Sequence, residues 1–199
     1  MICVTTRIAV ALFDGAEELD WAGPWEVLAA WAQQWPDDEI EVFTLARDER
    51  PVTCAKGLRV VPDRTWATAG KVDVLVYPGG MGTRRELKDG AVLEWLRNLR
   101  NDGALMTSVC TGALVYAAAG FLHQRPATTY WSAFDALQAL EPTVEVRPDD
   151  RFVDSGDVIT AAGVSAGIDM ALHLVARVHS PDRARAVRRY IQYDPAPPV

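Results

Sequence analysis

One cysteine, Cys110, stands where the sequence changes character within the segment Ala104–Phe121. Apolar and β-branched residues precede it and an alanine-rich run follows it, which predicts a strand that leads into a helix. The pattern Ser108-x-Cys110-x-Gly112-Ala113 has the form of a nucleophile elbow, a sharp turn that requires small flanking residues. Such a turn would place the thiol at the positive end of a helix, which favours the reactive thiolate. The alternative is a buried cysteine that packs as a small hydrophobe.

A glycine-rich loop, Tyr77–Gly82 (YPGGMG), follows another apolar run. If this loop lies beside the elbow, the backbone N–H of Thr111 and that of Gly79 or Gly80 can converge on a developing negative charge, as in an oxyanion hole. We therefore expect Thr111 to belong to the catalytic group and Gly79 and Gly80 to contact the substrate.

An acidic segment supplies a candidate for proton transfer. Asp20 lies between Leu19 and Trp21, so we expect its side chain to enter a partly apolar pocket. Desolvation there raises the proton affinity of a carboxylate and allows it to exchange protons with a substrate. The neighbouring Glu17 and Glu18 are expected to be solvated loop charges.

The sequence around the remaining cysteines and histidines gives little indication of a catalytic role. Cys3 and Cys54 lack a position between a strand and a helix, and His173 and His179 fall on an expected late helix. His123 falls in an expected turn, so the sequence gives no basis for asserting a Cys–His catalytic pair.

The elements that must position these residues alternate between strands and helices along the chain. Apolar runs predict strands at 7–13, 39–46, 72–80 and immediately before Cys110, and short strands within 144–163. Helical spacing or composition predicts helices at 25–35, 91–101, 132–140, 165–178 and 181–193, with a short hairpin within 51–66. This alternation predicts an α/β fold with a mainly parallel sheet between helices, and sites then form at the carboxyl ends of the strands. Without an internal repeat or linker, residues 1–199 are expected to form a single domain.

Composition narrows the class of protein further. The 199 residues carry a net charge of −7, which gives no general attraction to nucleic acid or to an anionic membrane surface. No stretch is long and apolar enough for a membrane span, and the N-terminus does not resemble a signal peptide. Three cysteines at wide spacings fit neither a disulfide framework nor a zinc site. We therefore expect a cytoplasmic protein without a metal ion or cofactor.

Several motifs together resemble the ThiJ/PfpI superfamily, over nearly the whole chain. They are GAEELD, DVLVYPGGMG, SVCTGALVYAAAGFL and GDVITAAGVSAGIDMALHLV. The resemblance implies a flavodoxin-like fold related to class I glutamine amidotransferases, with the family acid at Asp20 and the nucleophile at Cys110. The segments LDWAGPWEVL, SVCTGA and AGVSAGIDMAL are similar to the isonitrile hydratase-like branch, although sensor domains of AraC-type regulators share them.

One position departs from the family pattern. The segment RPATTYW places Tyr130 where relatives usually carry a histidine. Tyr130 can donate a hydrogen bond, and we expect Tyr130 and Trp131 to contact the substrate.

The resemblance implies an isonitrile hydratase-like enzyme. Cys110 would attack the terminal carbon of an isonitrile to form a thioimidate, with Asp20 as acid and base, and hydrolysis would release an N-substituted formamide. Two alternatives remain open: a hydrolase or glyoxalase on the same scaffold, and a non-enzymatic small-molecule or redox sensor. A homodimer is expected because family members usually associate, and a small molecule is the expected partner.

Overall fold

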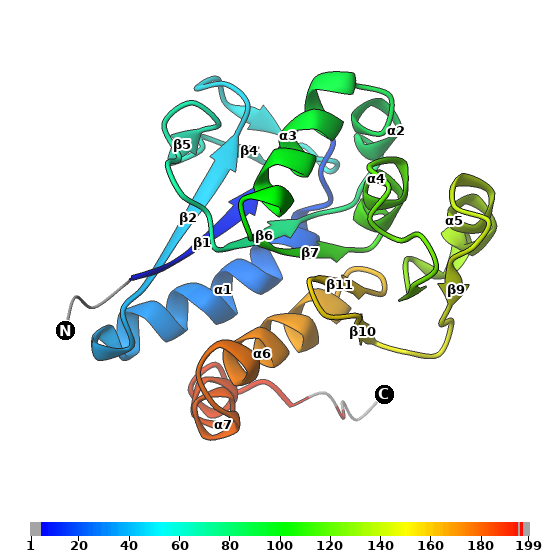
Figure 1. Cartoon of the computed structure of the whole chain (residues 1–199). Coiled ribbons are helices and arrows are strands. Elements are labelled where there is room, and N and C mark those ends of the chain that lie inside the picture. Colours follow the sequence, from blue (N-terminus) through cyan, green and yellow to red (C-terminus); the bar gives the residue numbers. More distant parts are fainter. Residues whose placement is uncertain (1–4, 195, 197–199) are drawn as a thin grey trace.

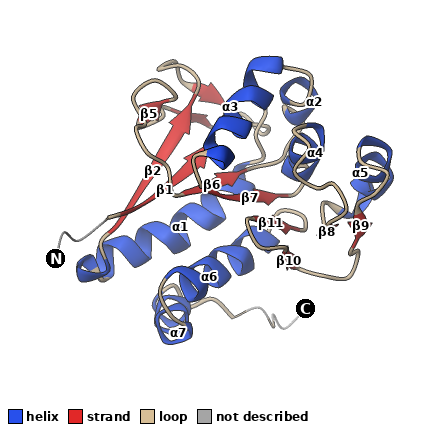
Figure 2. Cartoon of the chain, viewed as in Figure 1, coloured by secondary structure: helices blue, strands red, loops and turns tan. Residues whose placement is uncertain are grey.

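The computed structural model describes residues 5–194 and 196 and has an α/β architecture around a seven-stranded sheet (Figure 1, Figure 2). The strands of this sheet are β1 (Thr6–Ala11), β2 (Ile40–Ala46), β5 (Arg64–Thr65), β6 (Val74–Tyr77), β7 (Leu105–Val109), β10 (Phe152–Asp154) and β11 (Val158–Ala161). Two small sheets pair β3 (Val52–Thr53) with β4 (Arg59–Val60) and β8 (Pro126–Ala127) with β9 (Glu145–Val146). The helices are α1 (Glu18–Gln34), α2 (Thr83–Glu86), α3 (Gly90–Asn101), α4 (Gly112–Ala118), α5 (Phe134–Leu140), α6 (Ala166–Val178) and α7 (Pro181–Tyr190), with short 3-10 helices η1 (Pro36–Asp38) and η2 (Trp131–Ala133).

The main sheet has the order β10-β11-β7-β6-β1-β2-β5. Its neighbouring strands are parallel except β10, which runs antiparallel to β11. Helices α1 and α6 cover one face and helices α3 and α4 cover the other (Figure 1). The predicted α/β fold with a mainly parallel sheet between helices is therefore confirmed.

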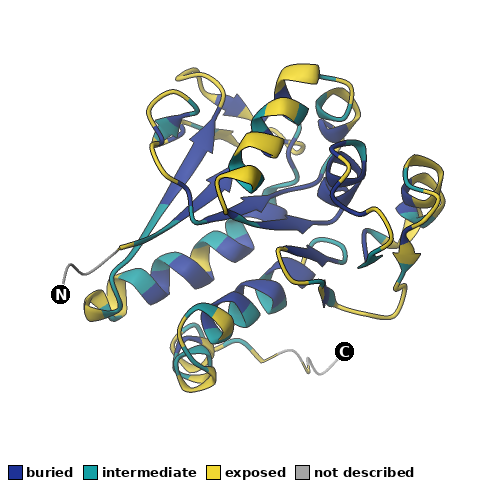
Figure 3. Ribbon diagram, viewed as in Figure 1, coloured by how far each residue is buried: buried dark blue, intermediate teal, exposed yellow. Residues whose placement is uncertain are grey.

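The central strands are apolar because both of their faces are covered. All four residues of β6 and the last four of β1 are buried, as expected for parallel strands between two helical layers. The exposed residues lie mainly on the outer sides of helices and in loops (Figure 3). No helix of the described ranges is long and apolar enough to cross a bilayer.

Helix α1 begins at Glu18 rather than at Trp25, where the sequence predicted it. The helix also includes Gly23 and Pro24, which tertiary packing keeps helical. A Cβ added to Gly167 of α6 would lie 3.1 Å from Cγ of Pro24. Helices α1 and α6 therefore pack closely at these two residues, where Gly167 has no side chain. The early start places Asp20 in the first turn of α1.

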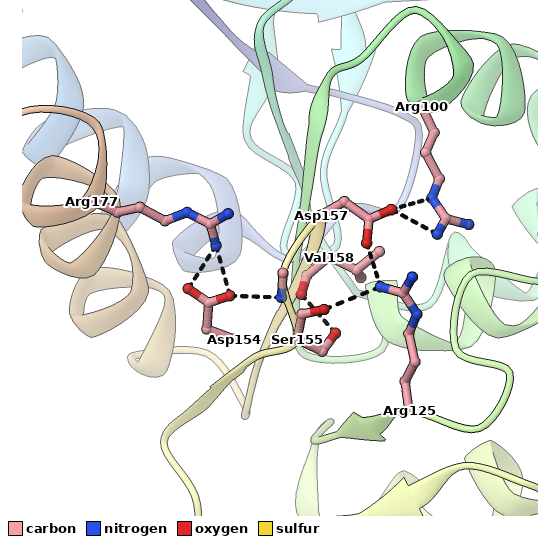
Figure 4. A network of polar contacts seen from close by, with 8 residues as sticks. Arg100, Arg125, Asp154, Ser155, Asp157, Val158 and Arg177 are labelled. Atoms are coloured by element: carbon pink, nitrogen blue, oxygen red, sulfur yellow. Dashed lines mark hydrogen bonds and ion pairs between the residues drawn. The ribbon is translucent and has the colours of Figure 1, made fainter.

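Ion pairs fix the turn between β10 and β11 to the surrounding elements (Figure 4). Asp157 pairs with Arg100 of α3 at 2.7 Å and also with Arg125. Asp154 pairs with Arg177 of α6 at 2.6 Å. These contacts attach the antiparallel edge of the sheet to helices on both faces, and they hold β11, the strand next to β7.

Candidate active site

Cys110 occupies a strained turn between β7 and α4. Its φ angle of 56° lies in the left-handed region, which is costly for a residue with a side chain and is common at functional sites. Two backbone bonds hold the turn, because the Cys110 N–H donates to the carbonyl oxygens of Ala161 at 3.1 Å and Ala162 at 3.0 Å. The predicted nucleophile-elbow geometry is therefore present.

Small residues next to Cys110 allow the elbow to approach the neighbouring loop. A Cβ added to Gly112 would lie 2.6 Å from the carbonyl oxygen of Tyr77. On the other side, the Thr129 hydroxyl donates to the Cys110 carbonyl oxygen at 2.7 Å. The elbow is thus packed against β6 and against the segment that leads to Tyr130.

Asp20 is completely buried beside Cys110. Its Oδ2 accepts the Gly79 N–H at 2.9 Å, and its carboxyl group is close enough to the Cys110 thiol for each group to shift the pKa of the other. Its Oδ1 is buried and has no partner among the described residues. An unpaired oxygen on a buried carboxyl group is costly, and here it lies next to the side chain that could react.

Burial raises the pKa of Asp20 to about 7, and the charge of Glu17 adds to the rise, although the Gly79 N–H opposes it. Burial and the nearby Asp20 carboxylate raise the pKa of the Cys110 thiol to about 12. Two acids in contact resist being ionised together. Burial and Asp20 therefore oppose the effect of the helix end, which was expected to favour the thiolate.

The backbone N–H groups of the glycine loop after β6 bond to side chains of the site. The Gly79 N–H donates to Asp20, and the Gly80 N–H donates to the Thr111 hydroxyl at 2.9 Å. Neither group is free to donate to a substrate oxygen, so the expected oxyanion hole does not include them. Side chains are also excluded here, because a Cβ added to Gly79 would lie 2.5 Å from the Thr111 nitrogen.

The backbone N–H groups of Thr111 and Val164 lower the pKa of the Cys110 thiol and so favour its charged form, although burial outweighs them. Sequence reasoning missed Val164, which follows β11 and has a φ angle of 46°. A valine gives no signal of a left-handed conformation in the sequence, because β-branched residues rarely adopt it.

Tyr130 and Trp131 lie beside the loop that carries Val164. The Tyr130 ring occupies the space that a Cβ on Gly163 would need, and its centroid is 5.5 Å from that of Trp131. Tyr130 is half-buried, whereas Trp131 is 72% exposed. The two rings are therefore placed near the elbow, with Trp131 on the surface.

The other candidates lie apart from this group. The three histidines contact Thr143, Asp154 and Asp38 on the surface. Cys54 is buried near the Trp21 side chain, and burial raises its pKa. Cys3 lies outside the described residues.

A mainly parallel sheet that carries a cysteine elbow, a buried acid and a glycine loop defines a class of protein. Comparison of the sequence with models of known families identifies the same class. The chain belongs to the DJ-1/PfpI family, whose model matches residues 6–177.

Similar proteins of this family differ in what they do. The chain is 37% identical over 193 residues to the isonitrile hydratase of Pseudomonas putida, a match that covers 96% of this chain and 80% of the relative. It is 36% identical over 153 residues to the HTH-type transcriptional regulator CdhR of Pseudomonas aeruginosa, covering 77% of this chain and 45% of the regulator. A crystal structure of a ThiJ/PfpI family protein from Pseudomonas syringae superposes with a TM-score of 0.86 at 31% identity, over 98% of this chain and 78% of the other.

Proposed function

We propose that the protein is an isonitrile hydratase-like enzyme that converts an isonitrile and water into an N-substituted formamide. The observation that carries the proposal is the contact between the Cys110 thiol and the buried Asp20 carboxyl group. It places a nucleophile beside a proton carrier, and a pKa of about 7 suits Asp20 both to accept and to donate a proton. Identity to the Pseudomonas putida isonitrile hydratase over 96% of this chain supports the same reaction class.

The first half of the reaction adds the thiol to the substrate. Asp20 accepts the thiol proton while the sulfur of Cys110 forms a bond to the terminal carbon of R–N≡C. Asp20 then returns the proton to that carbon, which leaves the thioimidate Cys110–S–CH=N–R. No atom leaves in this step, so the protein gains the full mass of the isonitrile. Covalent catalysis of this kind divides one difficult addition into two easier steps.

The second half hydrolyses the thioimidate. Asp20 accepts a proton from a water molecule, whose oxygen attacks the carbon of the intermediate. The proton passes to nitrogen, the carbon–sulfur bond breaks, and the sulfur regains the proton from the hydroxyl group of the adduct. The product R–NH–CHO leaves, and both Asp20 and Cys110 return to their starting states.

Backbone groups and nearby rings complete the proposed site. The N–H groups of Thr111 and Val164 stabilise negative charge on the sulfur, while Gly79 and Gly80 hold Asp20 and Thr111 in place. Tyr130 and Trp131 are proposed to contact the apolar R group, as aromatic side chains commonly do in ligand sites.

The test is turnover of cyclohexyl isocyanide, with formation of N-cyclohexylformamide followed by mass spectrometry. Wild type should produce the formamide, and Cys110→Ala should not. Methylglyoxal and a chromogenic peptide, assayed in parallel, report on the glyoxalase and peptidase alternatives. Turnover of either one in place of the isonitrile would contradict the proposed reaction.

A small-molecule sensor is the second candidate, because 77% of this chain also matches the regulator CdhR. A sensor would bind the isonitrile or a related molecule without consuming it. A redox sensor fits the site less well, since oxidation favours an accessible thiolate and Cys110 is buried with a raised pKa.

We further propose that residues 1–199 form one domain and act as a cytoplasmic homodimer. Large apolar side chains near the site are exposed, including Met81 at 69% and Trp131 at 72%, and a second copy could cover them. The described cysteines, Cys54 and Cys110, are free thiols, which suits a reducing compartment. Light scattering that gives a monomer mass at micromolar concentration would contradict the dimer.

A further inference from the structure

The crevice at the carboxyl edge of the sheet is divided in two. Strands β2 and β6 lie on opposite sides of β1, and ligands of open α/β sheets bind where the strand order reverses in this way. Here the loops that follow β1 and β6 touch across that point. The Glu17 N–H donates to the Gly79 carbonyl oxygen at 2.9 Å, and the Gly82 N–H donates to the Gly15 carbonyl oxygen at 3.1 Å. Asp20 and Cys110 belong to the half next to α1.

The other half is a cleft of about 320 Å³ beside α2 and α3. Neither Asp20 nor Cys110 lines it. Its volume lies at the lower end of the range for small-molecule sites. Much of its lining is apolar, and the rings of Trp66 and Trp95 stack in its wall with centroids 4.3 Å apart.

Among the described residues, the ion pairs of this cleft leave one carboxyl group, that of Glu86, and one guanidinium group, that of Arg85, without an ion-pair partner. Three arginines and four acidic residues line it. Asp89 pairs with Arg47 at 2.8 Å, and Arg50 pairs with Asp14 at 2.7 Å and with Asp48 at 4.0 Å.

Glu86 of α2 is the fourth acid. Its Oε2 accepts the hydroxyl of the buried Tyr77 at 3.0 Å, and no ion pair of Glu86 occurs within the described part of the chain. Burial raises the pKa of Glu86, although the Tyr77 hydroxyl and the more distant charges of Arg85 and Arg47 oppose the rise. A cation bound next to Glu86 would replace the solvation that burial removes.

We propose that this cleft is a second ligand site, separate from Cys110, and that it binds a small primary amine with an apolar, ring-sized body. The ammonium group would donate to the Glu86 carboxylate. The ring would contact the apolar wall that contains Phe13, Val92 and Trp95.

Three probes with one ring and different head groups test the proposal: benzylamine, benzyl alcohol and benzoate. Amide chemical shifts of the wild-type protein are followed at pH 8, where benzylamine is still protonated. Benzylamine should shift signals of the cleft residues with a dissociation constant on the order of 1 mM, a reasonable value for so small a ligand. Benzyl alcohol and benzoate should bind at least about tenfold more weakly. Equal binding of the three, or benzylamine shifts confined to the surroundings of Asp20 and Cys110, would overturn the proposal.

Two variants localise the interaction. Glu86→Gln keeps the shape of the side chain and an acceptor for Tyr77, and it should weaken benzylamine binding at least about tenfold. Asp48→Asn is the matched control, because it removes the same charge from an exposed position in the same cleft and should change the affinity less than about twofold. If Asp48→Asn weakens binding as much as Glu86→Gln, general charge attraction explains the result and the proposed site is wrong. The comparison of head groups on wild type decides the matter even if Glu86→Gln fails to fold.

Discussion

At the scale of single residues, the proposed chemistry depends on transfer of the Cys110 thiol proton to Asp20. Burial raises the pKa of both side chains, and the charge of Asp20 raises the pKa of Cys110 further. We therefore expect the thiol to react only once another group accepts its proton. This arrangement makes the two side chains interdependent, and replacing one should change the measurable properties of the other.

Asp20→Asn should have opposite effects on alkylation and on turnover. Without the carboxylate, the pKa of Cys110 falls, so iodoacetamide at pH 7 should label Cys110 faster than in wild type. Turnover should fall roughly a hundredfold or more, because the proton carrier is lost. Labelling is followed by peptide mass spectrometry, with buried Cys54 as the internal control. Slower labelling of Cys110 in the variant would contradict the electrostatic account.

Tyr130 provides a second prediction at this scale. Its hydroxyl has no hydrogen-bond partner among the described residues, so Tyr130→Phe should change kcat/KM by no more than the ~1 kcal/mol of one hydrogen bond to substrate. Tyr130→His should restore the family pattern and raise activity or broaden the range of isonitriles accepted. Kinetics on a series of isonitriles checks both variants. Unchanged kinetics in both would place Tyr130 outside the site.

The sequence could predict Cys110 and Asp20 because their neighbours reveal them. Small residues flank the cysteine, and apolar residues flank the acid. The hydrogen-bond partners of Gly79 and Gly80 could not be predicted, since they depend on side chains 59 and 31 positions away in the chain. The N–H of Val164 was missed for the same reason, because only folding brings it to the sulfur.

At the scale of elements, the site is assembled by close contacts that exclude side chains. The loop after β6 passes between α1 and the elbow, and Gly79 lies where an added Cβ would meet both Thr111 and Asp20. The start of α1 at Glu18 also matters, because it places Asp20 in the first turn of the helix, beside the elbow. The sequence predicted the main strands, but it placed the start of this helix at Trp25, because packing of Pro24 against Gly167 of α6 cannot be seen in the sequence.

Gly79→Ala should damage both folding and activity. The added Cβ would lie 2.5 Å from the Thr111 nitrogen and 2.8 Å from Oδ2 of Asp20, so backbone must move. We expect a loss of roughly 1–3 kcal/mol in the free energy of unfolding, as for other overpacked sites, and no measurable turnover. Urea denaturation and the isonitrile assay measure the two effects.

Gly90→Ala is the matched control for that change. Gly90 starts α3, and an added Cβ would meet nothing within 4 Å. The variant should be as stable as wild type or slightly more so, because alanine favours the helix. If both alanine variants behave alike, the close approach at Gly79 does not limit the fold.

At the scale of the whole molecule, the buried acid should make stability depend on pH. The folded pKa of Asp20 is about 7, whereas its ordinary value is 3.8. The folded state therefore keeps a proton that the unfolded state has already lost, and stability falls as pH rises between those values. Above pH 7 the charged, buried carboxylate costs the fold roughly 2–4 kcal/mol.

Asp20→Asn removes this dependence. The asparagine oxygen can still accept the Gly79 N–H, but the group no longer titrates. Urea denaturation should show the stability of the variant relative to wild type rising by roughly 2–3 kcal/mol between pH 5 and pH 8. A constant difference across this range would mean that Asp20 has an ordinary pKa in the folded protein.

The central claim is that Cys110 forms a covalent bond to an isonitrile and releases it as a formamide. The most direct test is intact-protein mass spectrometry of a reaction quenched in acid within the first turnover. Wild type should gain the mass of one cyclohexyl isocyanide molecule, located on the Cys110 peptide, and should lose that mass as N-cyclohexylformamide appears. Formation of the formamide at the wild-type rate by Cys110→Ala, with no adduct on any cysteine, would contradict the account.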